Sequence, residues 1–248
     1  MSSTPRIFSP TAKVNWTSCP LDEFSLHHLK DVLRLRKGNL VEVVAGDTLW
    51  TVKLVEFQPK ANLMTTEPVR SVKIPIAPLT IQLIQCVPKV DKISEIIRSC
   101  TEMGVARITP VISERCVSVP TEKAAAKHAR WEQVVMSAAA QSRQIRVPVM
   151  DRLTNYSAAI SEPTSAKKII FWEDSTVSLR TALSTMGLNA SPHPISLSIV
   201  IGPEGGLSEA EVKAARELGY VEASLGATIL RVEHAGLVAI AQLAYALL

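Results

Sequence analysis

The sequence lacks the cysteine and histidine spacing of a metal site. Its four cysteines, Cys19, Cys86, Cys100 and Cys116, include no Cys-x-x-Cys pair, and no histidine stands at zinc-finger spacing. The pattern predicts neither a bound metal nor a disulfide framework. It favours a reduced, cytoplasmic protein.

Long apolar runs are also missing. The most apolar segment, Ala235–Leu248, contains Gln242 and is shorter than the roughly 18 residues that a membrane-spanning helix needs. A buried helix explains it better than a membrane anchor. The first residues, MSSTPRIFSP, do not place an apolar run after a basic region as a signal peptide does. We therefore expect no membrane partner.

The chain has no strong excess of charge of one sign. Lys and Arg number 27 and Asp and Glu 23, which gives a net charge of +4. Such an excess permits a polyanionic partner without requiring one. Hydrophobic residues make up 47% and charged residues 20%, values typical of a folded globular chain and not of a disordered one.

Prolines divide the chain into two parts. Pro68, Pro75 and Pro78 accompany the polar stretch Arg70–Lys73, a composition typical of a linker. Because 248 residues exceed the common domain size of about 150, we expect two domains, 1–75 and 76–248. Residues 1–75 hold 10 Lys and Arg against 7 Asp and Glu, so most of the positive excess lies in the first domain.

Apolar patterning predicts a different class for each part. In the first, Val41–Val44 and Leu49–Phe57 flank a turn-forming Ala45-Gly46-Asp47, which predicts a hairpin in a small β domain. In the second, strand-like runs alternate with segments of helical period, which predicts an α/β class with a mostly parallel sheet and helices on both faces. The predicted strands are Ile81–Val87, Arg107–Ile112, Lys168–Trp172, Ser196–Gly202 and Val221–Leu225, and the clearest helices are Asp91–Met103 and Lys123–Ala140.

A glycine-rich turn, IGPEGG (Ile201–Gly206), follows one predicted strand and precedes a helix. Ser208 and Glu211 have the spacing of a capping box for that helix. Glycines let the backbone approach a ligand closely, and ligands of open α/β sheets bind at the carboxyl ends of strands. A tight turn that needs positive φ is an equally good explanation of this loop by itself. It is not a Walker A loop, a dinucleotide-binding loop or a nucleophile elbow.

A second segment, LGATILRVEHAG (Leu225–Gly236), repeats the arrangement of strand end, glycine and loop before the last helix. It places Arg231 and Glu233 in an otherwise apolar stretch, where charged groups are seldom fully buried unless paired. These two residues form either a functional pair, a structural ion pair or a solvent-facing set.

Together these segments resemble the paired cofactor loops of the SPOUT methyltransferases. GVARITPVISERC (Gly104–Cys116), PRIF (Pro5–Phe8), HHLKDVLRLRKGN (His27–Asn39) and AAAQSRQIRVP (Ala138–Pro148) extend the likeness over nearly the whole chain. With these segments the chain is similar to the 16S rRNA uracil-N3-methyltransferase family, RsmE.

The resemblance implies both a fold and a function. The fold is a small N-terminal PUA-like β-barrel that binds RNA (1–75), followed by a SPOUT-type, mostly parallel α/β domain (76–248) with a C-terminal deep trefoil knot. The function is S-adenosylmethionine-dependent methylation of uridine N3 in 16S ribosomal RNA of the small subunit. The partners are that RNA and a second copy of the chain, without a metal. The apolar last helix is either part of the dimer interface or core.

The chain departs from the family pattern within or beside these segments. The departures are Ala140 (usually Glu), Arg143-Gln144 (usually Gly-Arg), Ala227 (usually Arg), and Val232 and His234 (each usually Thr). Lost polar groups there imply a shifted RNA contact, a different substrate or a weakened enzyme. Arg143 is placed to replace the displaced arginine one position earlier.

The chemistry of uracil sets what the site must supply. N3 carries a weakly acidic proton and becomes nucleophilic when that proton leaves, so the site needs a proton acceptor or cations that stabilise the uracil anion. The candidate cations are Arg231, Arg143 and Arg6. The candidate acceptor is Glu233 or Glu204, unless the carboxylate instead holds an arginine in place.

The resemblance also assigns residues to the cofactor and to RNA. The cofactor would lie against the two glycine loops and a third strand end, at Phe171, Glu173, Ile201, Gly202, Glu204, Gly205, Gly206, Leu225, Gly226, Ile229 and Leu230. RNA phosphates would meet a basic set on a short helix and its end, together with one residue of the PRIF segment: His28, Lys30, Arg34, Arg36, Lys37 and Arg6. The alternative for the basic set is a solvated helix face.

Two other functions compete with this one. The first is a non-enzymatic RNA-binding or ribosome-assembly factor that keeps the fold, and a retained cofactor pocket would argue against it. The second is a SPOUT methyltransferase with another RNA substrate, which mapping of the modified nucleotide would reveal.

Overall fold

The computed structural model describes residues 4–89, 92–116, 124–188 and 194–248. The chain forms two compact units. One comprises the residues through Pro75 together with Ala139–Val147, and the other comprises Ile76–Ala138 and Pro148–Leu248. The start of the helix predicted over Lys123–Ala140 lies partly outside the described residues.

A five-stranded sheet forms the first unit. Its order is β1-β3-β4-β5-β2, and its strands are β1 (Arg6–Phe8), β2 (Cys19–Pro20), β3 (Leu40–Ala45), β4 (Thr48–Gln58) and β5 (Leu63–Lys73). The antiparallel β3–β4 pair is the predicted hairpin, and Gly46 in its turn has φ +58°. The edge strands β1 and β2 do not pair with each other, so the sheet is a half-barrel rather than the closed barrel that the resemblance implied.

Short helical segments connect the strands of this half-barrel. They are η1 (Trp16–Ser18), α1 (Glu23–His27), η2 (His28–Val32) and η3 (Pro59–Ala61). Helix α1 begins after Asp22 because that carboxylate accepts the Ser25 backbone N–H at 2.8 Å. Leu26 and Leu29 are buried with apolar residues of the sheet, which fixes this helical segment to the core.

The predicted linker is shorter than the prolines indicated. Arg70–Lys73 belongs to β5, and the interpretation of this stretch as linker was wrong. Pro68 pairs with Val52 where the β4–β5 register shifts. A proline cannot donate a ladder hydrogen bond, and a strand tolerates it at such an irregularity.

A seven-stranded sheet forms the second unit and confirms the predicted α/β class with a parallel sheet. The strands are β6 (Leu79–Cys86), β7 (Arg107–Ile112), β8 (Val149–Met150), β9 (Thr154–Asn155), β10 (Lys168–Phe171), β11 (Ile195–Ile201) and β12 (Val221–Ala223). Their order is β12-β10-β11-β6-β7-β8, with β9 also on β7, and every pair is parallel. The strand predicted over Val221–Leu225 ends earlier, at Ala223.

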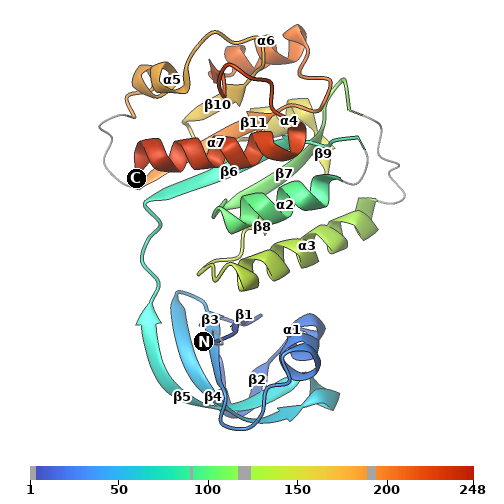
Figure 1. Ribbon diagram of the computed structural model, residues 1–248, viewed down its shortest axis with the longest axis vertical. Helices are drawn as coiled ribbons and strands as arrows, with labels where there is room; N and C mark the ends of the chain where they lie inside the picture. The colour runs from blue at the N-terminus through green and yellow to red at the C-terminus, as the bar shows by residue number, and fades with distance from the viewer. Residues whose placement is uncertain (1–3, 90–91, 117–123, 189–193) are drawn as a thin grey trace. The chain divides into compact units, whose positions relative to one another are not determined.

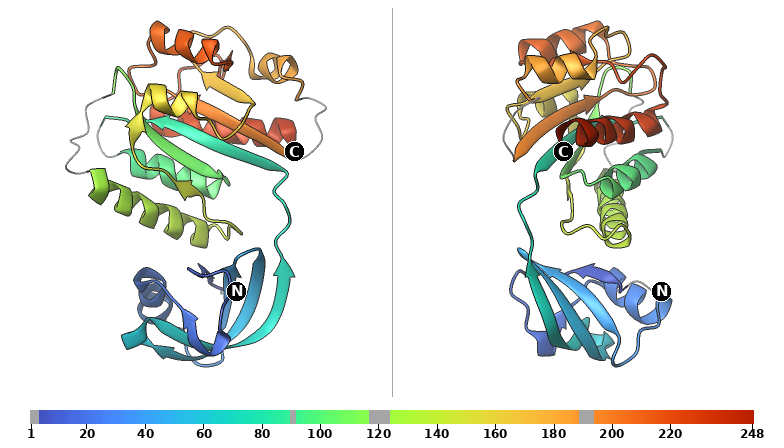
Figure 2. Two further views of the ribbon diagram at one scale, coloured as in Figure 1. Left: turned by 180° about the vertical axis from the view of Figure 1, so that it is seen from behind. Right: turned by 60° about the vertical axis from the view of Figure 1, so that its left-hand side comes forward.

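Helices cover both faces of this sheet. They are α2 (Ile93–Glu102), α3 (Ala124–Gln141), α4 (Tyr156–Ser161), α5 (Leu179–Thr185), α6 (Glu209–Glu217) and α7 (Val232–Leu247). Helices α2 and α7 pack side by side on one face (Figure 1), and α4 lies on the other (Figure 2). Successive residues of β6 alternate between the faces, since Ile84 joins the cluster beneath α4 and α6 while Leu83 meets α7.

Buried polar contacts tie the central strands together. The Gln82 side chain of β6 is buried, and its amide donates to the Thr109 hydroxyl of β7 at 3.0 Å. Its oxygen accepts the Ser198 hydroxyl of β11 at 2.7 Å. These bonds satisfy groups that would otherwise be costly to bury, and they fix neighbouring strands at the centre of the sheet.

Candidate active site

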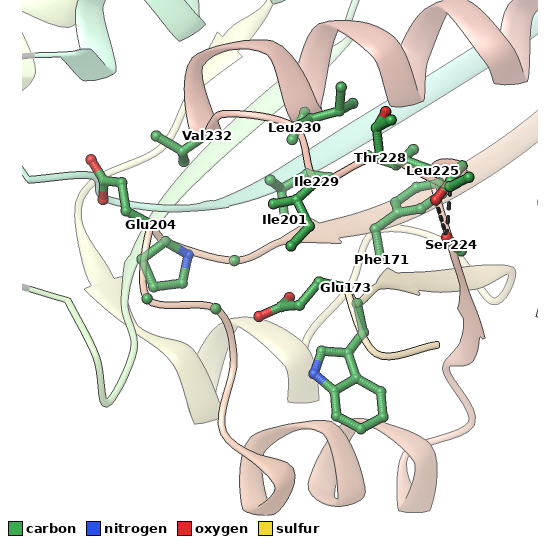
Figure 3. Close-up of a pocket in the computed structure, with 18 residues that line it drawn as sticks. Phe171, Glu173, Ile201, Glu204, Ser224, Leu225, Thr228, Ile229, Leu230 and Val232 are labelled. Atoms are coloured by element: carbon green, nitrogen blue, oxygen red, sulfur yellow. Dashed lines mark hydrogen bonds between the residues drawn. The ribbon is translucent and has the colours of Figure 1, made fainter. Parts of the chain in front are cut away.

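A cavity of about 310 Å³ lies where β10, β11 and β12 end. It is lined by the residues that follow these three strands, Phe171–Glu173, Ile201–Gly206 and Ser224–Leu230, and by Val232 and Ala235 of α7. Figure 3 shows side chains from all three strand ends around it. Its position follows from the parallel sheet, in which neighbouring strands end at the same edge.

Gly206 in the IGPEGG loop has to be glycine for two reasons. Its φ is +69°, a conformation that side chains disfavour. A Cβ at this position would also overlap the carboxylate of Glu173. Gly205 is different, because a Cβ there would meet only the Arg115 side chain, at 3.4 Å. The tight-turn explanation of the loop therefore applies at Gly206.

The segment after β7, which contains Glu114 and Arg115, holds the IGPEGG loop and the helix after it. Arg115 donates from its guanidinium to the Gly205 carbonyl at 2.8 Å. Glu211 forms the predicted capping box with Ser208, and its other oxygen accepts the Glu114 backbone N–H at 2.8 Å. One carboxylate thus caps α6 and joins it to the GVARITPVISERC segment, a link that the sequence did not reveal.

The second glycine loop is held by α7. Gln242 of that helix donates to the Leu225 carbonyl at 3.1 Å, and the Ser224 hydroxyl donates to the Gly226 carbonyl at 3.0 Å. Gly226 has φ +136°, and a Cβ there would meet nothing within 4 Å. Ile229 is 88% exposed on the cavity rim. The loop therefore leaves open space beside the cavity.

Every residue that we assigned to the cofactor lines this one cavity. Their contact with a cofactor stays a prediction. The lining also includes residues that we did not name: Trp172, Pro203, Ser224, Ala227, Thr228, Val232 and Ala235. Most of them lie between or next to the residues that we named. Assigning whole loops to the cofactor, instead of single residues, would have included them.

The charge of the cavity lining is negative. Glu173 and Glu204 are its charged side chains, and no Lys or Arg lines it among the residues that the structure describes. The Glu173 side chain extends towards the 201–206 loop, whereas Glu204 lies on the side of Val232 (Figure 3). Such a lining suits a ligand that carries positive charge, as the sulfonium and ammonium groups of S-adenosylmethionine do.

Arg231 and Glu233 stand at the start of α7, beside the cavity but outside its lining. Arg231 is 80% exposed at its side chain and lies 3.9 Å from Glu233. Glu233 is buried, and Lys92 donates to both of its oxygens at 3.0 and 3.1 Å. Its own backbone N–H and Lys92 hydrogen-bond the carboxylate and lower the pKa of Glu233 below its ordinary value. Lys92, which sequence reasoning missed, is the cation that Glu233 holds.

The remaining predicted acceptor, Glu204, is exposed on the IGPEGG loop. Its carboxylate accepts the backbone N–H of Lys89 at 2.9 Å. Lys89 and Lys92 both follow β6, whose carboxyl end adjoins that of β11. The only signal for these two lysines in the sequence was their place after a predicted strand.

Arg6 and Arg143 lie in the first unit. The Arg6 guanidinium is 8% exposed, forms an ion pair with Glu42 at 2.7 Å, and donates to the carbonyls of Arg143 and Gln144. Arg6 therefore holds the 139–147 segment, and its assignment to RNA or to catalysis stays a prediction. Arg143 has φ +58° and is half exposed, with contacts to Glu42 and the Thr4 carbonyl.

The basic set of the first unit is accessible. Lys30, Arg34, Arg36 and Lys37 are exposed on η2 and the segment that follows it, and His28 is half-buried at the start of η2. Arg34 has φ +53°, which ends the helical segment there. These residues lie within one short stretch of the chain. Their exposure is compatible both with RNA binding and with a solvated face that binds nothing.

Cys116 is the reactive thiol that the structure predicts. Hydrogen bonds from the Cys86 thiol and from Ser113 lower the pKa of Cys116 to about 6, although burial acts in the opposite direction and raises it. The Ser113 hydroxyl lies 3.1 Å from the Cys116 sulfur. Burial raises the pKa of Cys100 to about 12 and that of Cys19 to about 11.

We expect iodoacetamide to label Cys116 first in the folded protein. The thiolate is the reacting form, so the labelling rate should rise as pH increases through about 6. Mass spectrometry of the labelled peptides at several pH values measures this. Cys86→Ala removes the largest cause of the shift and should move the midpoint upward, while an unchanged midpoint would contradict the assignment.

Two absences concern the described part of the chain. No group of three or more His, Cys, Asp or Glu is arranged there to hold a metal ion. None of its helices is both long and apolar enough to span a membrane.

A cavity at the carboxyl ends of parallel strands is typical of α/β proteins that bind a ligand there. Comparison with known proteins identifies the family. A family model described as an RNA methyltransferase domain matches residues 75–244. The chain is therefore an RNA methyltransferase by family. The matched residues include the whole seven-stranded sheet and all three loops around the cavity.

Curated relatives narrow the class. The chain is 32% identical to the ribosomal RNA small subunit methyltransferase E of Synechocystis sp. over 88% of this chain and 70% of that one. It is 28% identical to the protein of the same name from Bacillus subtilis, over 89% and 87%. The chain belongs to the ribosomal RNA small subunit methyltransferase E family, which confirms the resemblance seen in its motifs.

Solved structures agree in fold. A ribosomal RNA small subunit methyltransferase E from Neisseria gonorrhoeae, bound to S-adenosyl methionine, is 29% identical with a TM-score of 0.82 over 98% of both chains. A methyltransferase from Legionella pneumophila in complex with the same cofactor is 25% identical, with a TM-score of 0.84 over 98% of both chains.

Proposed function

We propose that the protein transfers a methyl group from S-adenosylmethionine to N3 of a uridine in 16S ribosomal RNA of the small subunit. The observation that carries this proposal is the negatively charged cavity, walled by glycine loops at three parallel strand ends. Membership of the methyltransferase E family, whose gonococcal relative is bound to that cofactor, supports it.

The cavity residues hold the cofactor in this proposal. Main-chain groups of the two glycine loops contact it, because a loop without side chains lets backbone N–H and C=O groups reach a ligand. When bound, S-adenosylmethionine supplies a methyl group already activated by its sulfonium. The protein therefore needs neither a metal nor a covalent intermediate, and its task is to orient the base and stabilise its anion.

Arg231 is the cation that we assign to the uracil anion. It directly follows the second glycine loop, its guanidinium is exposed, and its charge stays fixed while the base loses its proton. Glu233 is poorly suited to accept that proton, because a carboxylate with a lowered pKa is a weaker base. Glu204 lines the cavity and is exposed, so we assign the proton to it.

The first unit serves RNA affinity in this proposal. It contains residues 1–75, for which we predicted a PUA-like RNA-binding domain, and its exposed basic set would contact phosphates. Such contacts position a polyanion without reading its sequence. Arg143 would add a cation from the 139–147 segment. The target base has to be unstacked before the second domain, 76–248, can receive it.

We expect the triple change Arg34→Ala, Arg36→Ala and Lys37→Ala to weaken RNA binding and to flatten its salt dependence. A variant that neutralises fewer phosphates releases fewer counterions on binding, so the slope of log K against log salt should fall by about 0.7–0.9 for each phosphate. Binding titrations at several salt concentrations measure this slope. Lys53→Ala, Lys60→Ala and Arg70→Ala form a charge-matched control in the same unit, and an equal slope in both triple variants would mean a solvated face.

The remaining parts of the proposal concern assembly and location. The deep trefoil knot is part of the proposal because the resemblance to the SPOUT methyltransferases implies it. A homodimer is supported by exposed apolar residues of α7 and its end, Tyr245 at 94% and Leu248 at 69%. A ribosomal substrate places the enzyme in the cytoplasm.

Mass spectrometry of ribosomal RNA tests the function. We expect 16S RNA from cells without the gene to lack one N3-methyluridine, and the purified protein with S-adenosylmethionine to restore it. An unchanged 16S RNA together with a methylated nucleotide elsewhere would reveal another substrate. A factor that binds RNA and leaves every nucleotide unchanged would be the assembly protein, an alternative favoured by the apolar residues at Ala227 and Val232 in the cavity lining.

A further inference from the structure

Glu173 is the carboxylate of the cavity that has no protein partner. The other one, on Glu204, accepts the backbone N–H of Lys89. In the described part of the chain Glu173 has no hydrogen bond or ion pair, and no cation lines the cavity to offset it. Arg216 stacks 5.5 Å over the neighbouring Trp172 ring, but its guanidinium is bonded to Glu222. A free negative charge therefore faces whatever fills the cavity.

Contacts of the loops around the cavity fix the position of the Glu173 carboxylate. Trp172 donates its backbone N–H to the Ala223 carbonyl at 3.1 Å, which fixes the chain after β10. The Glu173 carboxylate then lies against Gly206, at a distance that only a glycine permits. Figure 3 shows this side chain between the end of β10 and the 201–206 loop. A glycine that makes room for a carboxylate indicates that the placement matters.

We propose that Glu173 makes the cavity select the positively charged methyl donor over its neutral product. The inference rests on the proposed function and adds to it a specificity-determining residue. When the methyl group moves to the uracil N3 anion, the electron pair of the broken carbon–sulfur bond stays on sulfur. The sulfonium charge then disappears together with the charge of the anion. The attraction to Glu173 is present before transfer and absent after it, which favours release of S-adenosylhomocysteine.

The kinetic consequence follows from when the charge is lost. The sulfonium charge is already decreasing in the transition state, so Glu173 stabilises the bound donor more than the transition state. Glu173→Gln should therefore raise KM for S-adenosylmethionine without lowering kcat. A residue that acted on the uracil would instead lower kcat.

Titration calorimetry with three ligands tests the proposal. S-adenosylmethionine carries the sulfonium, sinefungin carries a protonated amine in its place, and S-adenosylhomocysteine is neutral there. We expect Glu173→Gln to weaken binding of the two charged ligands by about tenfold or more, because the carboxylate charge that attracts them is removed. Binding of S-adenosylhomocysteine should change by less than about twofold. Glu209→Gln removes an exposed carboxylate outside the cavity lining, so it is the charge-matched control and should leave the preference for charged ligands in place.

A second variant tests the same charge without touching Glu173. Ala227 is exposed and lines the cavity, so Ala227→Arg adds a cation to the lining. It should also reduce the preference for the charged ligands. Equal losses for all three ligands in Glu173→Gln, or an unchanged preference in either variant, would overturn the proposal. Failure of the unaltered protein to bind any of the ligands would instead overturn the proposed function, and this inference with it.

Discussion

Replacing Arg231 by alanine is expected to lower turnover by about 10²–10³, the usual cost of removing one preorganised group that stabilises a developing charge. The physical reason is that the uracil anion needs a fixed positive charge, and Arg231 is exposed directly after the second glycine loop. Arg231→Lys keeps the charge and loses the planar fork, so its turnover should fall between the two. Single-turnover rates at saturating cofactor measure the effect, which should appear in kcat as well as in kcat/KM.

The competing explanation for Arg231 is a structural ion pair with Glu233. In the structure Glu233 is held by Lys92 at 3.0 Å, and Arg231 lies farther away at 3.9 Å. Arg231→Ala should therefore leave the melting temperature nearly unchanged, because an exposed ion pair contributes on the order of 0–1 kcal/mol. Lys92→Met is the matched control and should lower it. Full activity in a stable Arg231→Ala protein would end the catalytic assignment.

The sheet of the second unit was predictable because its strands are buried on both faces. Such strands appear in the sequence as continuous apolar runs, and β7 has the limits that were predicted. Proline misled us at β5, since the bulge that accommodates Pro68 depends on the partner strand and leaves no local pattern. Met103 belongs to the apolar period of α2, but the helix ends at Glu102 and leaves it 40% exposed.

The sequence predicted which loops line the cavity, but it did not predict which charged side chains pair with each other. Two glycine segments after strands indicate which loops share the sheet edge. The partner of Glu233 is Lys92, 141 residues earlier in the chain, and local patterns cannot reveal such a contact. Arg6 is a similar case, because its contacts with Glu42 and with the carbonyls of residues 143 and 144 join parts of the chain that are distant in the sequence.

The change Gly206→Ala is expected to weaken S-adenosylmethionine binding by about 10- to 100-fold, at about tenfold for each 1.4 kcal/mol. The affinity falls because the new methyl group would displace the Glu173 carboxylate, which occupies that space. Backbone strain of an alanine at φ +69°, roughly 1–2 kcal/mol, is present in the free and the bound protein alike, so it lowers the stability instead. Calorimetry on the folded variant measures the affinity, and thermal unfolding measures the strain separately.

A double-mutant cycle tests the role of Glu173. In a Glu173→Ala background the methyl group at position 206 has room, so Gly206→Ala should leave the affinity nearly unchanged, and the effects of the two changes on affinity should be less than additive. Gly205→Ala is the matched control in the same loop. Its Cβ would make an ordinary contact with Arg115 at 3.4 Å, so its affinity should stay close to that of the unaltered protein. Additive losses in the cycle, or equal losses for the two glycines, would mean that Glu173 does not need the space that Gly206 leaves.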